Sequence, residues 1–131
     1  MGEERPPRRL VVDAMNVIGS RPTGWWRDRQ GAMARLVDEL ADYAAATGDD
    51  VTVVLDAQPF PLEGDGVDVR FAPPGRNAAD DEIVVIVAAD PEPSTLVVAT
   101  SDKALASRVR ALGADVMSAG ELRRRLDELS A

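Results

Sequence analysis

The sequence predicts a three-layer α/β/α domain in which helices cover both faces of a mainly parallel sheet of five strands. Short β-branched apolar runs alternate along the chain with longer segments whose apolar residues recur at helical spacing, a pattern typical of strands and crossover helices. Three of these runs lead into an aspartate, namely Asp13, Asp56 and Asp102. Because the carboxyl ends of parallel strands meet at one edge of a sheet, the three aspartates predict one acidic site there.

The composition restricts the class of protein and its chemistry. A length of 131 residues suits a single domain over 1–131, with the charged, proline-containing residues 1–8 as a loose lead-in. The chain has no cysteine and no histidine, so catalysis would depend on carboxylates, amides, hydroxyls or arginine. No stretch approaches the roughly 20 apolar residues of a membrane span, and the N-terminus lacks the apolar core of a signal peptide. We therefore expect a cytoplasmic protein with no membrane partner, whose oligomeric state stays open.

The net charge of −8 is unevenly distributed. Residues 1–30 carry six arginines and four acidic residues, whereas residues 31–131 carry nine basic and nineteen acidic residues. The segment around Asp13 is therefore locally positive, and Arg21, Arg27 and Arg29 could hold a phosphate backbone there. The alternative is a charged segment that is simply solvated.

The first half of the chain contains two predicted strands and one helix. A strand at 10–13 leads into a loop at 17–27 that holds Trp25 and Trp26, of which one is expected in the core and an exposed one could stack on a base. Apolar residues that recur at helical spacing between Met33 and Ala44 predict a helix after this loop, with Gly48 as its C-cap. The β-branched run 51–55 is the second strand.

The middle of the chain holds an ambiguous segment. A strand at 67–71 alternates apolar and charged residues, which is typical of an edge strand with one wet face. The run 83–87 is β-branched and by propensity favours a strand. We expect a helix instead, buried on most faces, because a parallel fourth strand needs a crossover and only residues 78–90 are long enough to supply it.

The remaining elements complete the predicted topology. They are a strand at 96–99, a helix at about 102–112 closed by Gly113, a strand at 114–117, and a last helix opened by the capping-box spacing of Ser118 and Glu121. This succession predicts the strand order 3-2-1-4-5. The order reverses between strands one and four, which places the site beside Asp13 and Asp102.

The acidic rim predicts a bound cation. Asp80 and Asp81 open the crossover helix and reach the same edge of the sheet as the strand-end aspartates. Four or five carboxylates without a balancing lysine or arginine repel one another, and a divalent metal such as Mg²⁺ or Mn²⁺ is the natural remedy.

Each of these residues also has a purely structural explanation. Asp13 could cap a loop, Asp102 could cap its helix, and helix-start electrostatics would account for Asp80 and Asp81. Asn16 could stabilise a turn. Thr100 and Ser101 resemble local caps more than ligands, and Asp56 would lie beside Asp13, behind the ligands or as a weak one. The functional hypothesis depends on their convergence.

Four motifs carry a resemblance to a known family: Asp13-Ala-Met-Asn16 followed by Val17-Ile18-Gly19, Val54-Leu-Asp56-Ala57, Ala79-Asp80-Asp81, and Ala99-Thr100-Ser101-Asp102. Over residues 9–129 the chain resembles the NYN branch of the PIN-like nuclease superfamily, and YacP-like NYN proteins in particular. Members are metal-dependent endoribonucleases, and at least one acts on messenger RNA at the ribosome. The resemblance implies a PIN-like fold, single-stranded RNA as the partner, and the ribosome as a second partner.

The resemblance also implies roles for individual residues. Metal ligands for Mg²⁺ or Mn²⁺ would come from the set Asp13, Asp80, Asp81 and Asp102. Asn16 matches the amide that follows the first acid and would orient a ligand or phosphate. Judged by position alone, Asp56 and Ser101 would lie behind the ligands, with Asp56 as a weak ligand in the alternative. Hydrolysis by this route leaves 5′-phosphate and 3′-hydroxyl ends.

Two other functions remain open. The chain could be a non-catalytic RNA-binding or partner-binding module that retains the acidic pocket. A receiver-like phosphotransfer domain fits less well, because receivers carry an acidic pair after strand one and a lysine at the end of strand five. This chain has Asp13 alone and Met117-Ser118 at those places.

Overall fold

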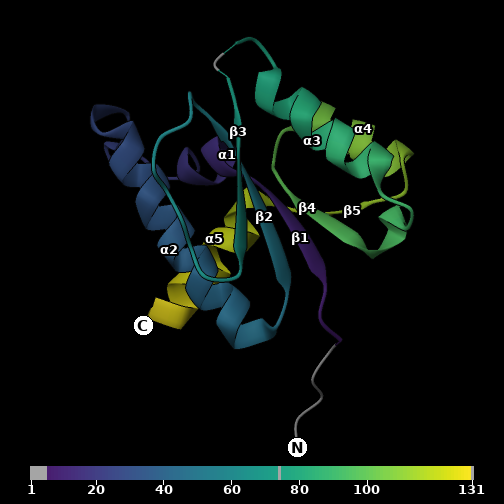
Figure 1. Ribbon diagram of the computed structural model, residues 1–131, viewed down its shortest axis with the longest axis horizontal. Coiled ribbons are helices and arrows are strands. Elements are labelled where there is room, and N and C mark those ends of the chain that lie inside the picture. Colours follow the sequence, from purple (N-terminus) through teal and green to yellow (C-terminus); the bar gives the residue numbers. More distant parts are fainter. Residues whose placement is uncertain (1–5, 74, 131) are drawn as a thin grey trace, which may run out of the picture.

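Five parallel strands form one sheet in the order β3-β2-β1-β4-β5 in the computed structural model of the chain (Figure 1). The structure describes residues 6–73 and 75–130. The strands are β1 (Arg9–Asp13), β2 (Asp50–Asp56), β3 (Val67–Ala72), β4 (Leu96–Ala99) and β5 (Asp115–Met117). All four strand pairings are parallel, so the predicted order is confirmed, with β1 at the centre and β3 at an edge.

Helices cover both faces of this sheet, which confirms the three-layer prediction (Figure 1). One face carries α1 (Ala14–Ile18), α2 (Arg29–Thr47) and α5 (Ala119–Ser130), and the other carries α3 (Ala78–Ala89) and α4 (Lys103–Ala111). Short 3-10 helices lie at Trp25–Arg27 and Pro93–Thr95. None of the helices in the described part of the chain combines the length and the apolar character that crossing a membrane requires.

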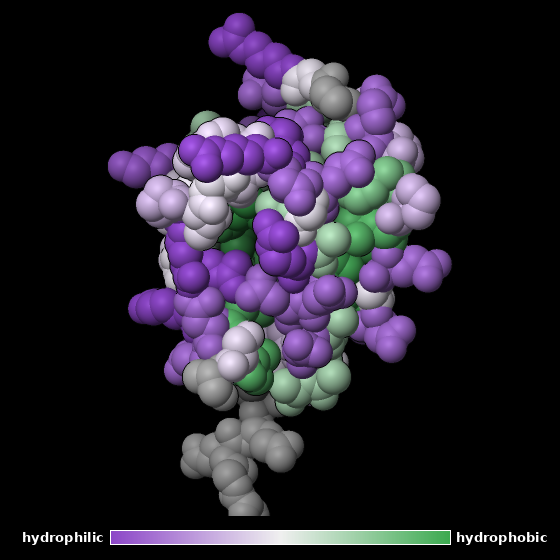
Figure 2. Space-filling view, turned by 90° about the vertical axis from the view of Figure 1, so that its left-hand side faces the viewer, coloured by the Kyte–Doolittle hydropathy of each residue, from purple (hydrophilic) through white to green (hydrophobic). Residues whose placement is uncertain are grey.

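The central strand is buried on both faces because its side chains alternate between two cores. Leu10 and Val12 pack into the core beneath α2 and α5, whereas Val11 packs into the core beneath α3 and α4. A strand without a solvated face positions its last residue rigidly, and that residue is Asp13. The face of the molecule on the side of α2, the left-hand side of Figure 1, is mainly hydrophilic, with apolar side chains in smaller patches (Figure 2).

Two helices differ from the predictions. Residues 14–18 form α1 directly after β1, so the loop begins at Gly19, whose N–H donates to the carbonyl of Met15 at 2.8 Å. The run 83–87 is helical as expected, but Val85 departs from the expected burial. Ile83 and Val87 are buried and Val84 and Ile86 are partly buried against the core, whereas Val85 is 60% exposed. Residues four apart share the face that α3 turns to the sheet, and the residue midway between them faces solvent.

Several helix ends lie where their residues predict. Gly48 ends α2 with φ of 76°, a left-handed conformation that favours glycine. Asp102 is the N-cap of α4, and the Ser118 hydroxyl accepts from the N–H of Glu121 at 3.1 Å. Residues 1–5 of the predicted lead-in lie outside the described residues. Arg8 is not loose, because its N–H donates to the Asp49 carboxylate at 2.8 Å.

Candidate active site

A cavity of about 310 Å³ opens at the carboxyl end of the sheet and brings the predicted acids together. Four aspartates from four segments line it: Asp13 at the end of β1, Asp56 at the end of β2, Asp80 in the first turn of α3, and Asp102 at the start of α4. Asn16 lines it as well. None of its lining residues, all of which belong to the described part of the chain, is basic. The cavity therefore has the charge pattern that the sequence predicts.

Asp13 is the most buried of the four carboxylates, with 6% of its surface exposed. Burial raises its pKa from 3.8 to about 6, and the negative charges of Asp80 and Asp102 act in the same direction. A hydrogen bond of 2.8 Å from the Thr100 hydroxyl to Oδ2 of Asp13 opposes the shift. The carboxyl group is thus held in a place where its negative charge is costly unless a cation offsets it.

Thr100 has a larger part in the site than the sequence indicates. Its side chain is buried at 1% exposure, and its Oγ1 both donates to Asp13 and accepts from the N–H of Asp102 at 3.1 Å. One hydroxyl therefore connects two of the acids that line the cavity. Its position was the available signal, because Val12 pairs with Ala99 and a residue directly after β4 must lie next to Asp13.

Asn16 and Ser101 fix the loop between β4 and α4. Oδ1 of Asn16 accepts from the N–H of Ser101 at 2.7 Å, and the Ser101 hydroxyl accepts from the N–H of Ala119 at 2.9 Å. Asn16 lines the cavity and Ser101 does not. The amide of Asn16 thus connects α1 to the segment that carries Asp102.

Asp102 combines the structural role and the cavity position that the sequence left as alternatives. Its Oδ1 accepts from the N–H groups of Ala104 and Leu105 at 2.9 and 3.1 Å, which caps α4. Its side chain also lines the cavity. Capping holds the carboxylate in one orientation.

Only one of the two acidic residues at the start of α3 lines the cavity. Asp80 lines the cavity, and burial together with the charge of Asp102 raises its pKa. Asp81 is not among the lining residues, and its Oδ1 instead accepts from Nη1 of Arg108 on α4 at 3.1 Å. Neighbouring residues of a helix point about 100° apart, so they do not share one cavity easily.

Asp56 carries an observation that points to a ligand. Its Oδ1 is buried without a hydrogen-bond partner, although buried polar atoms are normally paired. The atoms of the cavity that could coordinate a metal ion are carboxylate and amide oxygens, which suit Mg²⁺ or Mn²⁺. Among residues 6–73 and 75–130 no three acidic side chains form a ready-made metal site. The chemistry of the donors fits a divalent ion, and the spacing would have to tighten around it.

Comparison with known proteins assigns the chain to a family. Residues 10–131 match the family model described as the YacP-like NYN domain. The chain belongs to this family. No curated protein matches the chain.

Solved structures similar to this NYN domain come from the same family. The crystal structure of a mutant of Rae1 (YacP) from Bacillus subtilis has a TM-score of 0.80 and 28% identity, covering 94% of this chain and 77% of that one. A second crystal structure of Rae1 (YacP) has a TM-score of 0.74 and 28% identity, covering 92% and 74%. The family and these structures confirm the resemblance and support a nuclease-type, RNA-related function.

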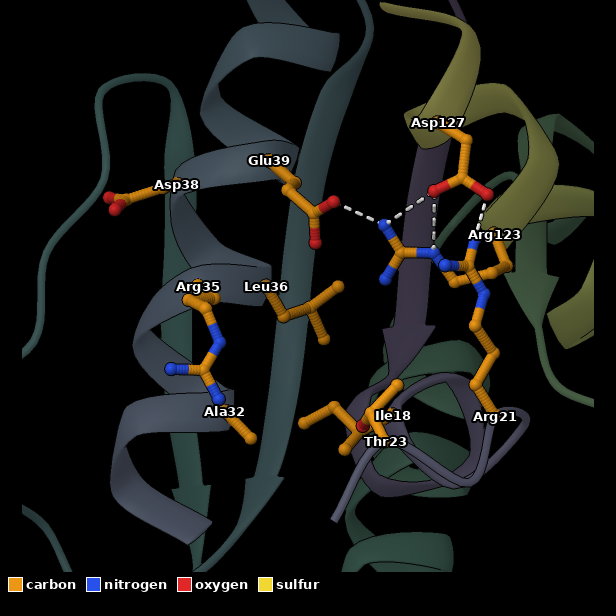
Figure 3. Close-up of a pocket in the computed structure, with 10 residues that line it drawn as sticks. All are labelled: Ile18, Arg21, Thr23, Ala32, Arg35, Leu36, Asp38, Glu39, Arg123 and Asp127. Atoms are coloured by element: carbon orange, nitrogen blue, oxygen red, sulfur yellow. Dashed lines mark hydrogen bonds and ion pairs between the residues drawn. The ribbon is translucent and has the colours of Figure 1, made fainter. Parts of the chain in front are cut away.

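The predicted RNA-binding arginines occupy two environments in the NYN domain. Arg27 and Arg29 are exposed. Arg21 instead forms an ion pair with Asp127 of α5 and lines a second cavity of about 640 Å³ between α1, α2 and α5. Figure 3 shows Arg21 reaching toward Asp127, and Arg123 between Glu39 and Asp127. Arg21 is thus engaged in holding the loop to α5.

The two tryptophans differ as expected. Trp25 is partly buried against the core beneath α2, and the Arg29 guanidinium lies 5.6 Å from the centre of its ring. Trp26 packs edge-on against Trp25 at 5.9 Å and is 54% exposed. The exposed ring of Trp26 thus directly precedes Arg27, which is exposed as well.

Proposed function

We propose that this NYN domain is a metal-dependent endoribonuclease that hydrolyses phosphodiester bonds of single-stranded RNA in the cytoplasm. The observation that carries the proposal is the cavity lined by four aspartates from four segments and by no basic side chain. A structural role would not require so many carboxylates in one place, since each raises the cost of ionising the others. Family membership supports the same class of activity.

Asp13, Asp80 and Asp102 would hold the ion, Mg²⁺ or Mn²⁺. The chemistry supplied by such an ion when bound is activation of water and neutralisation of charge on the reacting phosphate. Asp56, with its unpaired buried oxygen, is available as a weak ligand or as an acceptor for a coordinated group.

Two further residues of the site, Thr100 and Asn16, position these acids. The Thr100 hydroxyl donates to the carboxylate of Asp13 and accepts from the backbone N–H of Asp102, so it orients Asp13 relative to the start of α4. Asn16 fixes the backbone of Ser101 and with it the loop that carries Asp102. Hydrolysis at this site would leave 5′-phosphate and 3′-hydroxyl ends.

The substrate would be held outside the cavity. Arg27 and Arg29 would bind flanking phosphates, and Trp26 would stack on a base. Messenger RNA at the ribosome is the substrate that the family resemblance favours, in mRNA turnover or RNA processing.

The test is incubation of the purified protein with end-labelled single-stranded RNA, with Mn²⁺ or with EDTA. Internal cleavage that requires Mn²⁺, leaves 5′-phosphates and disappears in Asp13→Asn would support the proposal. Full activity in Asp13→Asn would contradict it.

The absence of a ready-made metal site among the described residues favours a second candidate, an RNA-binding module without catalysis. In that case the protein would shift labelled RNA in a gel, and neither Mn²⁺ nor Mg²⁺ would produce cleavage. Gel shift and cleavage of the same labelled RNA therefore distinguish the binding module from the nuclease.

A further inference from the structure

The two neighbouring acidic residues Asp80 and Asp81 lie in different environments. Asp80 lines the cavity, while Asp81 is 63% exposed at its side chain and forms an ion pair with Arg108. The family resemblance treats either residue as a metal ligand, but the structure gives Asp81 a different partner. Its contact with Arg108 therefore needs an explanation of its own.

Packing between two helices brings Arg108 to this position. Ile83 and Val87 of α3 share a core with Leu105 and Val109 of α4. Helical side chains lean toward the N-terminus of their helix, so Arg108 points back along α4 toward the end of the sheet where the cavity lies. Nη1 of Arg108 meets Oδ1 of Asp81 at 3.1 Å.

This ion pair contributes little to folding. Both side chains are about half exposed, and solvent-exposed pairs are generally worth between 0 and about 1 kcal/mol. The main consequence of the contact is the position of the guanidinium group. Asp81 holds a positive charge close enough to Asp80 to oppose the upward shift of the Asp80 pKa.

The guanidinium retains capacity for another anion. Arginine has five N–H donors in a planar fork, and the contact with Asp81 uses one of its terminal nitrogens. Such a fork matches the oxygens of a phosphate group. A cavity with four carboxylates repels a polyanion, so a cation at its rim is the element that an approaching phosphodiester needs.

We infer that Arg108 is a substrate-binding residue that contacts an RNA phosphate at the rim of the acidic cavity, and that Asp81 orients Arg108 and is not a metal ligand. The inference rests on the proposed function, because it names the residue that receives the substrate of that same site. Asp80 is then the member of the pair that faces the metal.

The test separates RNA binding from metal binding. RNA affinity is measured by fluorescence anisotropy in EDTA over a series of salt concentrations, so that no cleavage occurs. Metal binding is measured as the rise in melting temperature with Mn²⁺ in the absence of RNA. The variants are Arg108→Gln, Arg108→Lys and Asp81→Asn, and the control is Arg110→Gln, an exposed arginine in the same last turn of α4.

Arg108→Gln is expected to weaken RNA binding about tenfold and to lower the slope of log affinity against log salt by about 0.7, the value for one phosphate contact on a single strand. Arg108→Lys keeps the charge but not the fork, so it should retain the salt slope and lose part of the affinity. Asp81→Asn should weaken RNA binding less than Arg108→Gln does. All three variants and the control should keep the Mn²⁺ response, and the control should also bind RNA as the wild type does.

Two results would overturn this inference and leave the proposed function intact. One is unchanged RNA affinity and salt slope in Arg108→Gln while the wild type binds RNA. The other is loss of the Mn²⁺ response in Asp81→Asn to the extent seen in Asp13→Asn, which would make Asp81 a ligand. A wild type that neither binds RNA nor responds to Mn²⁺ would overturn the proposed function together with this inference.

Discussion

The Thr100 hydroxyl donates a hydrogen bond of 2.8 Å to the Asp13 carboxylate, although the two residues lie 87 positions apart in the chain. The contact joins the ends of β4 and β1, which pair in parallel with Val12 opposite Ala99. Because Oγ1 of Thr100 also accepts from the N–H of Asp102, one side chain relates the acids at the ends of both strands.

Thr100→Val should shift the pH dependence of activity upward. The substitution removes a hydrogen bond that favours the ionised form of Asp13, so the pKa of Asp13 should rise above its present value of about 6. Cleavage would then be lost at pH 6 to 7 and partly regained at higher pH. The measurement is the rate of Mn²⁺-dependent RNA cleavage against pH, with Thr23→Val, an exposed threonine, as the control. An identical pH profile in Thr100→Val would contradict the role of the hydroxyl.

Asp13 should make the metal-free protein less stable as the pH rises. The pKa of Asp13 is about 6 in the folded state and lower in the unfolded chain. Its contribution to the free energy of unfolding is therefore fully present below about pH 4 and is lost as the pH rises through about 6. The loss amounts to at most about 3 kcal/mol, and the raised pKa of Asp80 acts in the same direction. Asp13→Asn should remove most of this decline and should be at least as stable as the wild type at pH 7.5. Urea denaturation in EDTA at pH 4.5 and 7.5 measures the difference. If Asp13→Asn instead loses several kcal/mol at pH 7.5, Asp13 is a structural hydrogen-bonding residue.

Mn²⁺ or Mg²⁺ should raise the melting temperature in a concentration-dependent way. A ligand that binds the folded state and not the unfolded chain stabilises the protein in proportion to the logarithm of its concentration. Asp13→Asn and Asp102→Asn should reduce the rise, whereas Asp115→Asn, an exposed acid on β5 outside the cavity, should not. Thermal denaturation over a Mn²⁺ series provides the measurement. An equal rise in all variants would place the ion elsewhere.

Replacing Arg27 and Arg29 together by alanine should weaken RNA binding and reduce its salt dependence. Each lost phosphate contact lowers the salt slope for a single strand by about 0.7, because fewer counterions are released. The Mn²⁺ response should remain, since neither residue lines the acidic cavity. Anisotropy titrations at several salt concentrations test this, with Arg110→Ala as the control. Unchanged affinity would show that these arginines only solvate their loop.

The architecture was predictable because it depends on local patterns. β-branched runs bounded by turn residues define strands, and the need for a crossover between parallel strands made 78–90 a helix although its composition favours a strand. Parallel strands end at one edge, so the convergence of Asp13, Asp56 and Asp102 followed from the same pattern.

Tertiary structure alone decided which side chains face the cavity and which partners they take. The sequence cannot separate Asp80 from Asp81, because the rotation of α3 on the sheet and its packing against α4 determine that Asp81 meets Arg108. The same rotation leaves Val85 exposed. Thr100 and Arg21 acquire their partners from segments far away in the chain. Helical and strand periodicity determines which residues share a face, but the direction of that face depends on the neighbouring elements, which only the folded chain brings together.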